Sequence, residues 1–87
     1  MYALKIEKKA EKFLNKLSAK DQDIVFIKLE ALRSDPYRNN LDIKKLKGGS
    51  GNEYILRIRD FRFIYKIYNQ ELIIIIIDAN FRKDIYR

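Results

Sequence analysis

A run of five consecutive isoleucines, Ile73–Ile77, constrains the fold of this chain more than any other segment. The apolar stretch that contains it, residues 72–77, is far shorter than the roughly 20 residues that span a bilayer. A strand that is apolar on both faces is typical of the interior of a sheet covered on both sides. We therefore expect a central strand here, which extends from Glu71 to Asp78.

Three successive strands are predicted between Glu53 and Asp78, and they form an antiparallel meander. The first strand covers Glu53–Arg59 and alternates apolar with polar side chains, as a half-buried strand does. Asp60-Phe61 is the predicted turn into the second strand, and Asn69-Gln70 is the predicted turn into the isoleucine strand.

This prediction gives the sheet two unlike faces, with Arg59 paired with Arg62 and Leu56 paired with Tyr65. One face is expected to pack under helices, and it carries Tyr54, Leu56, Ile58, Phe63, Tyr65 and Ile67. The opposite face carries the cations Arg57, Arg59, Arg62 and Lys66 between the apolar residues Ile64, Tyr68, Ile73 and Ile75. A solvated face, with cations extended over apolar neighbours, is one interpretation. Because close arginines repel each other where acids are scarce, we favour an anionic ligand.

The N-terminal half predicts a short strand and then a helical hairpin. Residues 2–7 alternate as a strand does, and apolar residues at helical spacing follow from Ala10 to Leu17. Ser18 begins the second helix, with Asp21 in a weaker form of the capping box, and Ser34-Asp35-Pro36 ends it. Its broad apolar face comprises Ile24, Val25, Ile27, Leu29, Ala31 and Leu32. The expected fold is a single α+β domain over residues 1–87: an N-terminal strand, a helical hairpin, then an antiparallel sheet of three to four strands.

Residues 37–42 are predicted to form a polar loop, and all three glycines lie further on, in residues 48–52. Glycines can let backbone N–H groups approach a phosphate. No GK[ST] sequence follows this segment and no helix begins there, so we interpret it as a connector between elements.

Composition excludes several kinds of chemistry. The chain has no cysteine and no histidine, which excludes disulfides, thiolate catalysis, imidazole catalysis and Cys/His zinc sites. We expect no metal and no cofactor. The net charge of +7 indicates a polyanionic partner, and most of the excess positive charge lies in the second half of the chain. No targeting peptide is recognisable at the N-terminus, so we expect a soluble, cytoplasmic protein.

Four short motifs in order resemble the RelE/ParE superfamily of toxin–antitoxin ribonuclease toxins, and the resemblance covers nearly the whole chain. They are Leu46-Lys47-Gly48, Glu53-Tyr54-x-Leu56-Arg57-Ile58, Phe61-Arg62-Phe63-Ile64-Tyr65 and Arg82-Lys83-Asp84-Ile85-Tyr86. The resemblance implies a RelE-like, microbial-ribonuclease-like fold whose site lies on the exposed face of the sheet. The RelE branch of this family cleaves mRNA in the ribosomal A site, whereas the ParE branch inhibits DNA gyrase.

Site residues are implied by the same resemblance, which favours the RelE branch. Arg62 and Arg82 match phosphate-binding arginines, Tyr86 matches the C-terminal tyrosine, and Lys47 stands where the family has a basic residue. Ile55 and Arg57 stand where well-known RelE proteins carry two lysines, one of which is thought to be the general base. Isoleucine cannot accept a proton, and arginine is a poor base.

The expected activity is that of an endoribonuclease in which the RNA 2′-OH attacks the adjacent phosphate. Arg57, Arg62 and Arg82 would stabilise the charge on the phosphate, and Tyr86 would either transfer a proton or stack on a base. The cations expected to bind RNA or phosphate are Lys45, Lys47, Arg59, Lys66, Lys83 and Arg87. Expected partners are the ribosome with its mRNA and a RelB-like antitoxin with acidic or amphipathic helices.

Two other functions remain open from the sequence. The first is a ParE-like inhibitor of DNA gyrase without nuclease activity. The second is a nucleic-acid-binding module without catalysis. A neighbouring gene for a small acidic protein would favour either toxin over the binding module.

Overall fold

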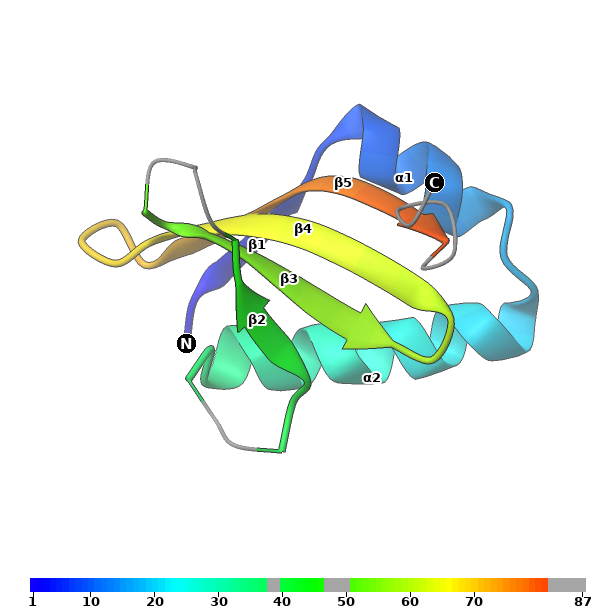
Figure 1. Ribbon diagram of the computed structural model, residues 1–87, viewed down its shortest axis with the longest axis horizontal. Helices are drawn as coiled ribbons and strands as arrows, with labels where there is room; N and C mark the ends of the chain where they lie inside the picture. Colours follow the sequence, from blue (N-terminus) through cyan, green and yellow to red (C-terminus); the bar gives the residue numbers. More distant parts are fainter. Residues whose placement is uncertain (38–39, 47–50, 82–87) are drawn as a thin grey trace.

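The computed structural model describes residues 1–37, 40–46 and 51–81. In these ranges the chain forms two helices and five strands, which Figure 1 shows in order. The elements are β1 (Ala3–Ile6), α1 (Lys8–Asn15), α2 (Ala19–Ser34), β2 (Ile43–Lys45), β3 (Glu53–Ile58), β4 (Phe61–Tyr68) and β5 (Ile73–Phe81). The predicted α+β class and its order of strand, helical hairpin and antiparallel strands are confirmed.

The strands form one mixed sheet in the order β1-β5-β4-β3-β2. Strand β1 lies parallel to β5, with Ala3 opposite Ile73, while the other neighbours are antiparallel. The sheet is larger than predicted because β1 joins it and because residues 43–45 pair with β3 as a short edge strand. Most of the predicted glycine connector lies outside the described residues.

Strand β5 is an inner strand, as predicted, because β1 and β4 flank it. Ile74 and Ile76 are completely buried in the core. The expectation that both faces of this strand are covered is wrong, because Ile73, Ile75 and Ile77 stay partly exposed. The isoleucine run therefore fills the core with two of its five side chains.

The β3–β4 hairpin turns one residue earlier than predicted. Arg59 and Asp60 form the turn, Arg59 has a φ of 54°, and Ile58 pairs with Phe61. The pairing of Leu56 is with Phe63 rather than with Tyr65. This register places Phe61 in the strand and buries its ring, which a turn position would have exposed. Because the pairing moves by two residues, the assignment of side chains to the two faces is unchanged.

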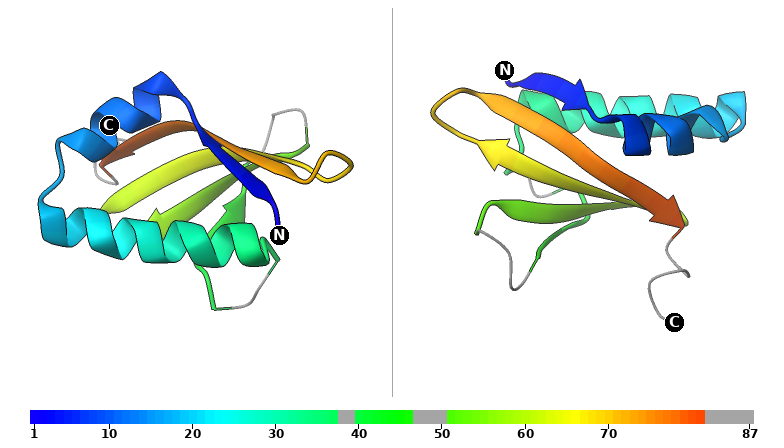
Figure 2. Two further views of the ribbon diagram at one scale, coloured as in Figure 1. Left: turned by 180° about the vertical axis from the view of Figure 1, so that it is seen from behind. Right: turned by 90° about the horizontal axis from the view of Figure 1, so that it is seen from above.

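Both helices lie on the same side of the sheet (Figure 2, right). Helix α1 buries Ala10, Phe13 and Leu14, and the Phe13 ring makes edge contacts with Phe61, Phe63 and Phe81. Helix α2 buries Val25, Leu29 and Leu32 in the same core. The residues predicted to face the helices on β3 and β4 lie in or against this core, so the predicted sheet face is confirmed.

Helix α2 begins and ends where the sequence indicates. The Ser18 hydroxyl accepts a hydrogen bond from the Asp21 N–H at 3.1 Å, and the last helical residue is Ser34. Its predicted apolar face is too broad, because Ile27 is 67% exposed. Neither helix in the described part of the chain is long and apolar enough to cross a membrane.

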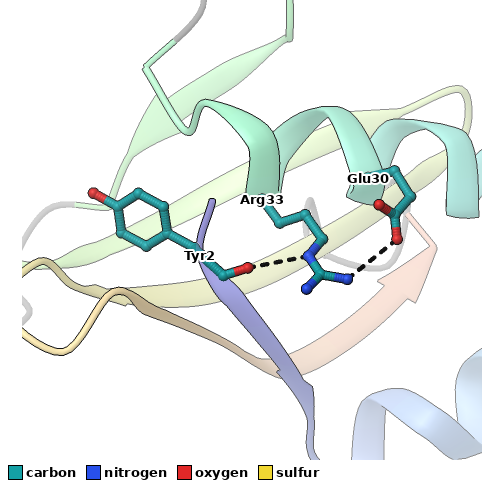
Figure 3. A network of polar contacts seen from close by, with 3 residues as sticks. All are labelled: Tyr2, Glu30 and Arg33. Carbon is teal, nitrogen blue, oxygen red and sulfur yellow. Dashed lines mark hydrogen bonds and ion pairs between the residues drawn. The ribbon is translucent and has the colours of Figure 1, made fainter.

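The C-terminal end of α2 holds the first strand in place (Figure 3). The Tyr2 N–H donates to the Arg33 carbonyl at 2.8 Å, and the Arg33 Nε donates to the Tyr2 carbonyl at 3.0 Å. Glu30 accepts from the other end of the same guanidinium at 3.4 Å. Through these contacts a residue at the start of the chain is fixed to the end of the second helix.

Candidate nucleic-acid interface

We call the side of the sheet that faces away from α1 and α2 the outer face (Figure 2, right). Successive side chains of a strand point to opposite faces of the sheet. The residues that point into the core are Leu56 and Ile58 of β3, Phe61 and Phe63 of β4, and Ala79 of β5. The residues between them therefore point outward. The outer-face residues of β3, β4 and β5 include Glu53, Ile55, Arg57, Arg62, Ile64, Lys66, Tyr68, Ile73, Ile75 and Asn80.

Three polar residues form one row across the outer face. Arg57 of β3 pairs with Arg62 of β4, and Arg62 pairs with Asn80 of β5. Neighbouring strands are about 4.8 Å apart, so the row spans about 10 Å. We call these three residues the polar row. Like charges placed directly opposite each other on a sheet are destabilising, so an anion between the two guanidinium groups would relieve their repulsion.

Acidic side chains partly neutralise the cations of the outer face, which the sequence prediction did not include. Arg57 Nη2 donates to Asp42 Oδ1 at 2.9 Å, and the side chain of Arg57 is 30% exposed. Lys66 Nζ lies 3.8 Å from Glu53 Oε2 on the neighbouring strand. The expectation that acids are scarce on this face is therefore wrong for Arg57 and Lys66.

Apolar side chains occupy the part of the outer face next to the polar row. Ile64 pairs with Ile55 on one side and with Asp78 on the other. Ile55 is 4% exposed, whereas Ile64, Ile75 and Tyr68 are partly exposed. The outer face thus combines a basic end with an apolar centre, as predicted from the alternation of residues.

The structure brings together some of the predicted site residues and separates others. Arg57, Arg62 and Lys66 share the outer face, but Arg59 lies in the β3–β4 turn, so its predicted place on that face is wrong. Lys45 is exposed on the edge strand β2 and pairs with Tyr54, which packs against the core on the helix side of the sheet. Five predicted site residues lie outside the described residues: Lys47, Arg82, Lys83, Tyr86 and Arg87.

Two residues of the site were missed in the sequence, Asp42 and Asn80. Asp42 precedes β2, and its contact with Arg57 spans 15 residues, which no local pattern indicates. Asn80 reaches the outer face because a bulge interrupts the β4–β5 register between Ile64 and Tyr65. A strict alternation from the buried Ile74 and Ile76 would have turned Asn80 into the core.

Tyr65, on strand β4 of the sheet, is not suited to act as a proton-transfer group. The Tyr65 ring is completely buried on the helix-covered side and stacks on Tyr54 with 5.7 Å between ring centroids. Burial raises the pKa of the Tyr65 phenol well above its usual value, and the nearby Tyr54 and Tyr37 raise it further. Because this phenol stays protonated at neutral pH, it cannot accept a proton from a substrate.

The described part of the chain also contains no cluster of three acidic residues that could hold a metal ion.

The arrangement can therefore bind a phosphate group electrostatically. Guanidinium groups form paired hydrogen bonds with phosphate oxygens, and Arg57 and Arg62 lie opposite each other on adjacent strands. The apolar centre beside them can contact a base or an apolar side chain of a partner.

Comparison with known proteins gives structural matches. No protein-family model matches the sequence, and no curated protein is significantly similar to it. A chain of the archaeal RelE–RelB complex from Pyrococcus horikoshii OT3 matches with a TM-score of 0.81 and 28% identity, over 93% of this chain and 94% of that one.

Two further solved structures agree. The RelB–RelE complex from Methanococcus jannaschii gives a TM-score of 0.74 and 25% identity, over 94% of each chain. The isolated RelE toxin of E. coli gives a TM-score of 0.77 and 21% identity, over 99% of this chain and 92% of that one. The resemblance to RelE toxins that the motifs indicated is confirmed at the level of structure.

Proposed function

We propose that this chain, a structural relative of the RelE toxins, is the toxin of a toxin–antitoxin pair and a ribosome-dependent endoribonuclease. It would cleave mRNA in the ribosomal A site and so stop translation. The observation that carries the proposal is the pairing of Arg57 with Arg62 on the outer face of a RelE-like sheet. Two guanidinium groups at adjacent positions can hold one phosphate and stabilise the charge that develops on it.

RNA supplies its own nucleophile for this reaction. The 2′ oxygen attacks the adjacent phosphorus, the bond from phosphorus to the 5′ oxygen breaks, and the 2′ proton leaves while the 5′ oxygen gains a proton. The products are a 2′,3′-cyclic phosphate and a free 5′-OH. In this proposal Arg57 and Arg62 contact the non-bridging oxygens, and Arg82 is a third contact that rests on the family motif alone.

The proton-transfer group is proposed from the sequence. Ile55 and Arg57 stand at the positions of the family's two lysines, and neither is a useful base at neutral pH. Tyr86 is the remaining candidate on the family motif, and it would either transfer a proton or stack on a base. The ribosome would hold the RNA in an attack-ready conformation, which leaves the protein less alignment to perform.

Contacts with RNA outside the reacting phosphate are proposed for the other basic residues. The net charge of +7 favours association with RNA, and affinity for RNA should fall steeply with salt. The proposed contacts are Lys45, Lys47, Arg59, Lys66, Lys83 and Arg87. Lys66 would contact RNA from the outer face, where Glu53 now lies 3.8 Å from its ammonium group.

We also propose a RelB-like antitoxin as the physiological partner. The relatives from Pyrococcus horikoshii and Methanococcus jannaschii were solved in complex with RelB. The basic end and apolar centre of the outer face suit a partner with acidic, amphipathic helices. Copurification of this chain with the product of a neighbouring acidic gene would test the partnership.

In vitro translation followed by primer extension on the mRNA tests the activity. The proposal requires new 5′ ends at defined positions of the A-site codon, which appear only when ribosomes are present. Intact mRNA would contradict it. If intact mRNA coincided with inhibited DNA gyrase, the function would be that of the ParE branch, whose members share this fold.

A further inference from the structure

The side chain of Asn80 makes no hydrogen bond that stabilises the described part of the fold. Its Oδ1 is buried, and within the residues that the structure describes it has no hydrogen-bond partner. A buried acceptor without a donor costs free energy, so the polarity of this side chain is not explained by stability. The position of Asn80 directly opposite Arg62 suggests what the carboxamide is for.

A β-bulge places Asn80 in this position. Tyr65 pairs with Ile76 and Ile64 pairs with Asp78, so Ile77 is the extra residue of β5. After the bulge Ala79 points into the core, and the Phe81 ring contacts Phe13 on the helix side. Asn80 therefore points to the outer face beside Arg62. Bulges often re-aim a side chain next to a functional site.

The neighbouring arginine limits what Asn80 can reach. Side chains directly opposite each other on antiparallel strands have Cβ atoms roughly 5 Å apart. If Arg62 holds a phosphate, the nucleotide group at that distance is the ribose, because the 2′-OH lies on the carbon next to the one that carries the 3′-phosphate. The edge of the base lies farther away. A neutral carboxamide oxygen can accept a hydrogen bond from a hydroxyl group without repelling the phosphate.

We propose that Asn80 binds the ribose 2′-OH next to the phosphate held by Arg62, so that the outer face selects RNA over DNA. This inference rests on the proposed function, since it takes Arg62 to be a phosphate-binding residue. A half-turn about the Cβ–Cγ bond exchanges Oδ1 with Nδ2, and it breaks no hydrogen bond of Oδ1 within the described residues. Since no other group among the described residues holds the carboxamide, it can present its oxygen to the ligand.

Binding of short single-stranded oligonucleotides by the isolated protein tests this assignment. Fluorescence polarisation at low salt would compare one RNA sequence with the same sequence in DNA and in 2′-O-methyl RNA, both of which lack the hydroxyl donor. The wild-type protein should bind the RNA roughly three- to tenfold more tightly than either analogue, which corresponds to one hydrogen bond. Asn80→Leu and Asn80→Ala should bind all three oligonucleotides with the affinity that the wild type has for the DNA.

Two controls separate recognition of the ribose from other roles. Asn80→Leu should keep or raise the melting temperature, because the carboxamide makes no hydrogen bond in the described fold. Arg62→Ala should weaken binding of RNA and DNA by the same factor, as loss of a phosphate contact does. A large drop in melting temperature for both Asn80 variants would assign Asn80 a structural role and overturn the proposal.

The remaining outcomes also decide the question. Equal binding of RNA and DNA by the wild type, or a preference for RNA that persists in both Asn80 variants, would overturn the role of Asn80. The translation assay judges the proposed cleavage separately, because it scores new mRNA ends rather than affinity. A protein that cuts mRNA but binds RNA and DNA equally would retain the proposed function and lose this inference.

Discussion

Asp42 and Arg57 are joined twice across the β2–β3 edge of the sheet. The Arg57 N–H donates to the Asp42 carbonyl at 2.9 Å, and Arg57 Nη2 donates to the Asp42 carboxylate, also at 2.9 Å. The carboxylate therefore fixes one end of the polar row and also competes with an anionic ligand for the same guanidinium.

Removal of this carboxylate should strengthen anion binding. Asp42→Ala is expected to raise affinity for inorganic phosphate and for RNA by about fivefold, the effect of roughly 1 kcal/mol of repulsion between close charges in water. The loss of stability should be no more than about 1 kcal/mol, because the Asp42 side chain is 56% exposed. Calorimetric titration with phosphate and thermal unfolding measure the two effects.

The matched control for Asp42 is Asp23→Ala. Asp23 is exposed on α2, so the variant has the same net charge but loses its carboxylate on the helix side of the sheet. Asp23→Ala should change phosphate affinity far less than Asp42→Ala. Equal gains in the two variants would mean that net charge, rather than competition for Arg57, governs binding.

The inner position of β5 predicts unequal effects of charge along the isoleucine run. Ile74→Asp and Ile76→Asp should prevent cooperative folding, because a buried, unpaired charge costs roughly 3–5 kcal/mol and both side chains are completely buried. Ile75→Asp should still fold, since its side chain is partly exposed on the outer face. Circular dichroism during thermal unfolding would show this difference, and three equally stable variants would contradict the packing of β5.

Tyr65→Phe should be neutral or stabilising at neutral pH. The Tyr65 hydroxyl is buried and has no hydrogen-bond partner among the described residues, so its removal costs no bond in that part of the fold. Burial raises the folded-state pKa of this phenol above its usual value of about 10, so the unfolded chain loses the proton first. Ionisation of Tyr65 therefore leaves the free energy of unfolding unchanged below about pH 10 and lowers it as pH rises further.

Urea denaturation across the alkaline range measures this dependence. The wild type should lose stability above about pH 10 more steeply than Tyr65→Phe. Parallel pH profiles for the two proteins, or a variant that is clearly less stable at pH 7, would show that the hydroxyl is satisfied in solution.

Tyr86→Phe separates the two roles proposed for the C-terminal tyrosine. The variant keeps the ring for stacking but loses the ionisable hydroxyl. If the phenol transfers a proton, cleavage on the ribosome should fall by roughly 10²–10⁴-fold while ribosome binding is unchanged. Cleavage close to that of the wild type would leave stacking as the role of Tyr86.

Local patterns predicted most of the elements because their signals lie within a few residues. Ser18 caps α2 through its own side chain, and alternation from Tyr54 to Ile58 fixed which residues of β3 enter the core. The hairpin turn was misplaced by one residue because it contains no glycine. Burial of Phe61 against Phe13, a contact between distant segments, decides its position.

Features that depend on distant contacts could not be predicted. The parallel pairing of β1 with β5 joins Ala3 to Ile73, which are far apart in the sequence. The bulge at Ile77 changes which side chains face outward, and five isoleucines in a row give no sign of where alternation breaks. Both features matter for the site, because the bulge brings Asn80 beside Arg62.

The rate of A-site mRNA cleavage by Arg62→Ala tests the central claim most directly, namely that the polar row of the outer face acts on RNA. Lys28→Ala is the matched control, since it removes one positive charge from an exposed position on α2. Primer extension on translating ribosomes should show cleavage reduced by roughly 10²–10³-fold in Arg62→Ala, the usual cost of losing a transition-state donor, and nearly unchanged in Lys28→Ala. Equal cleavage rates for Arg62→Ala and the wild type would contradict the claim.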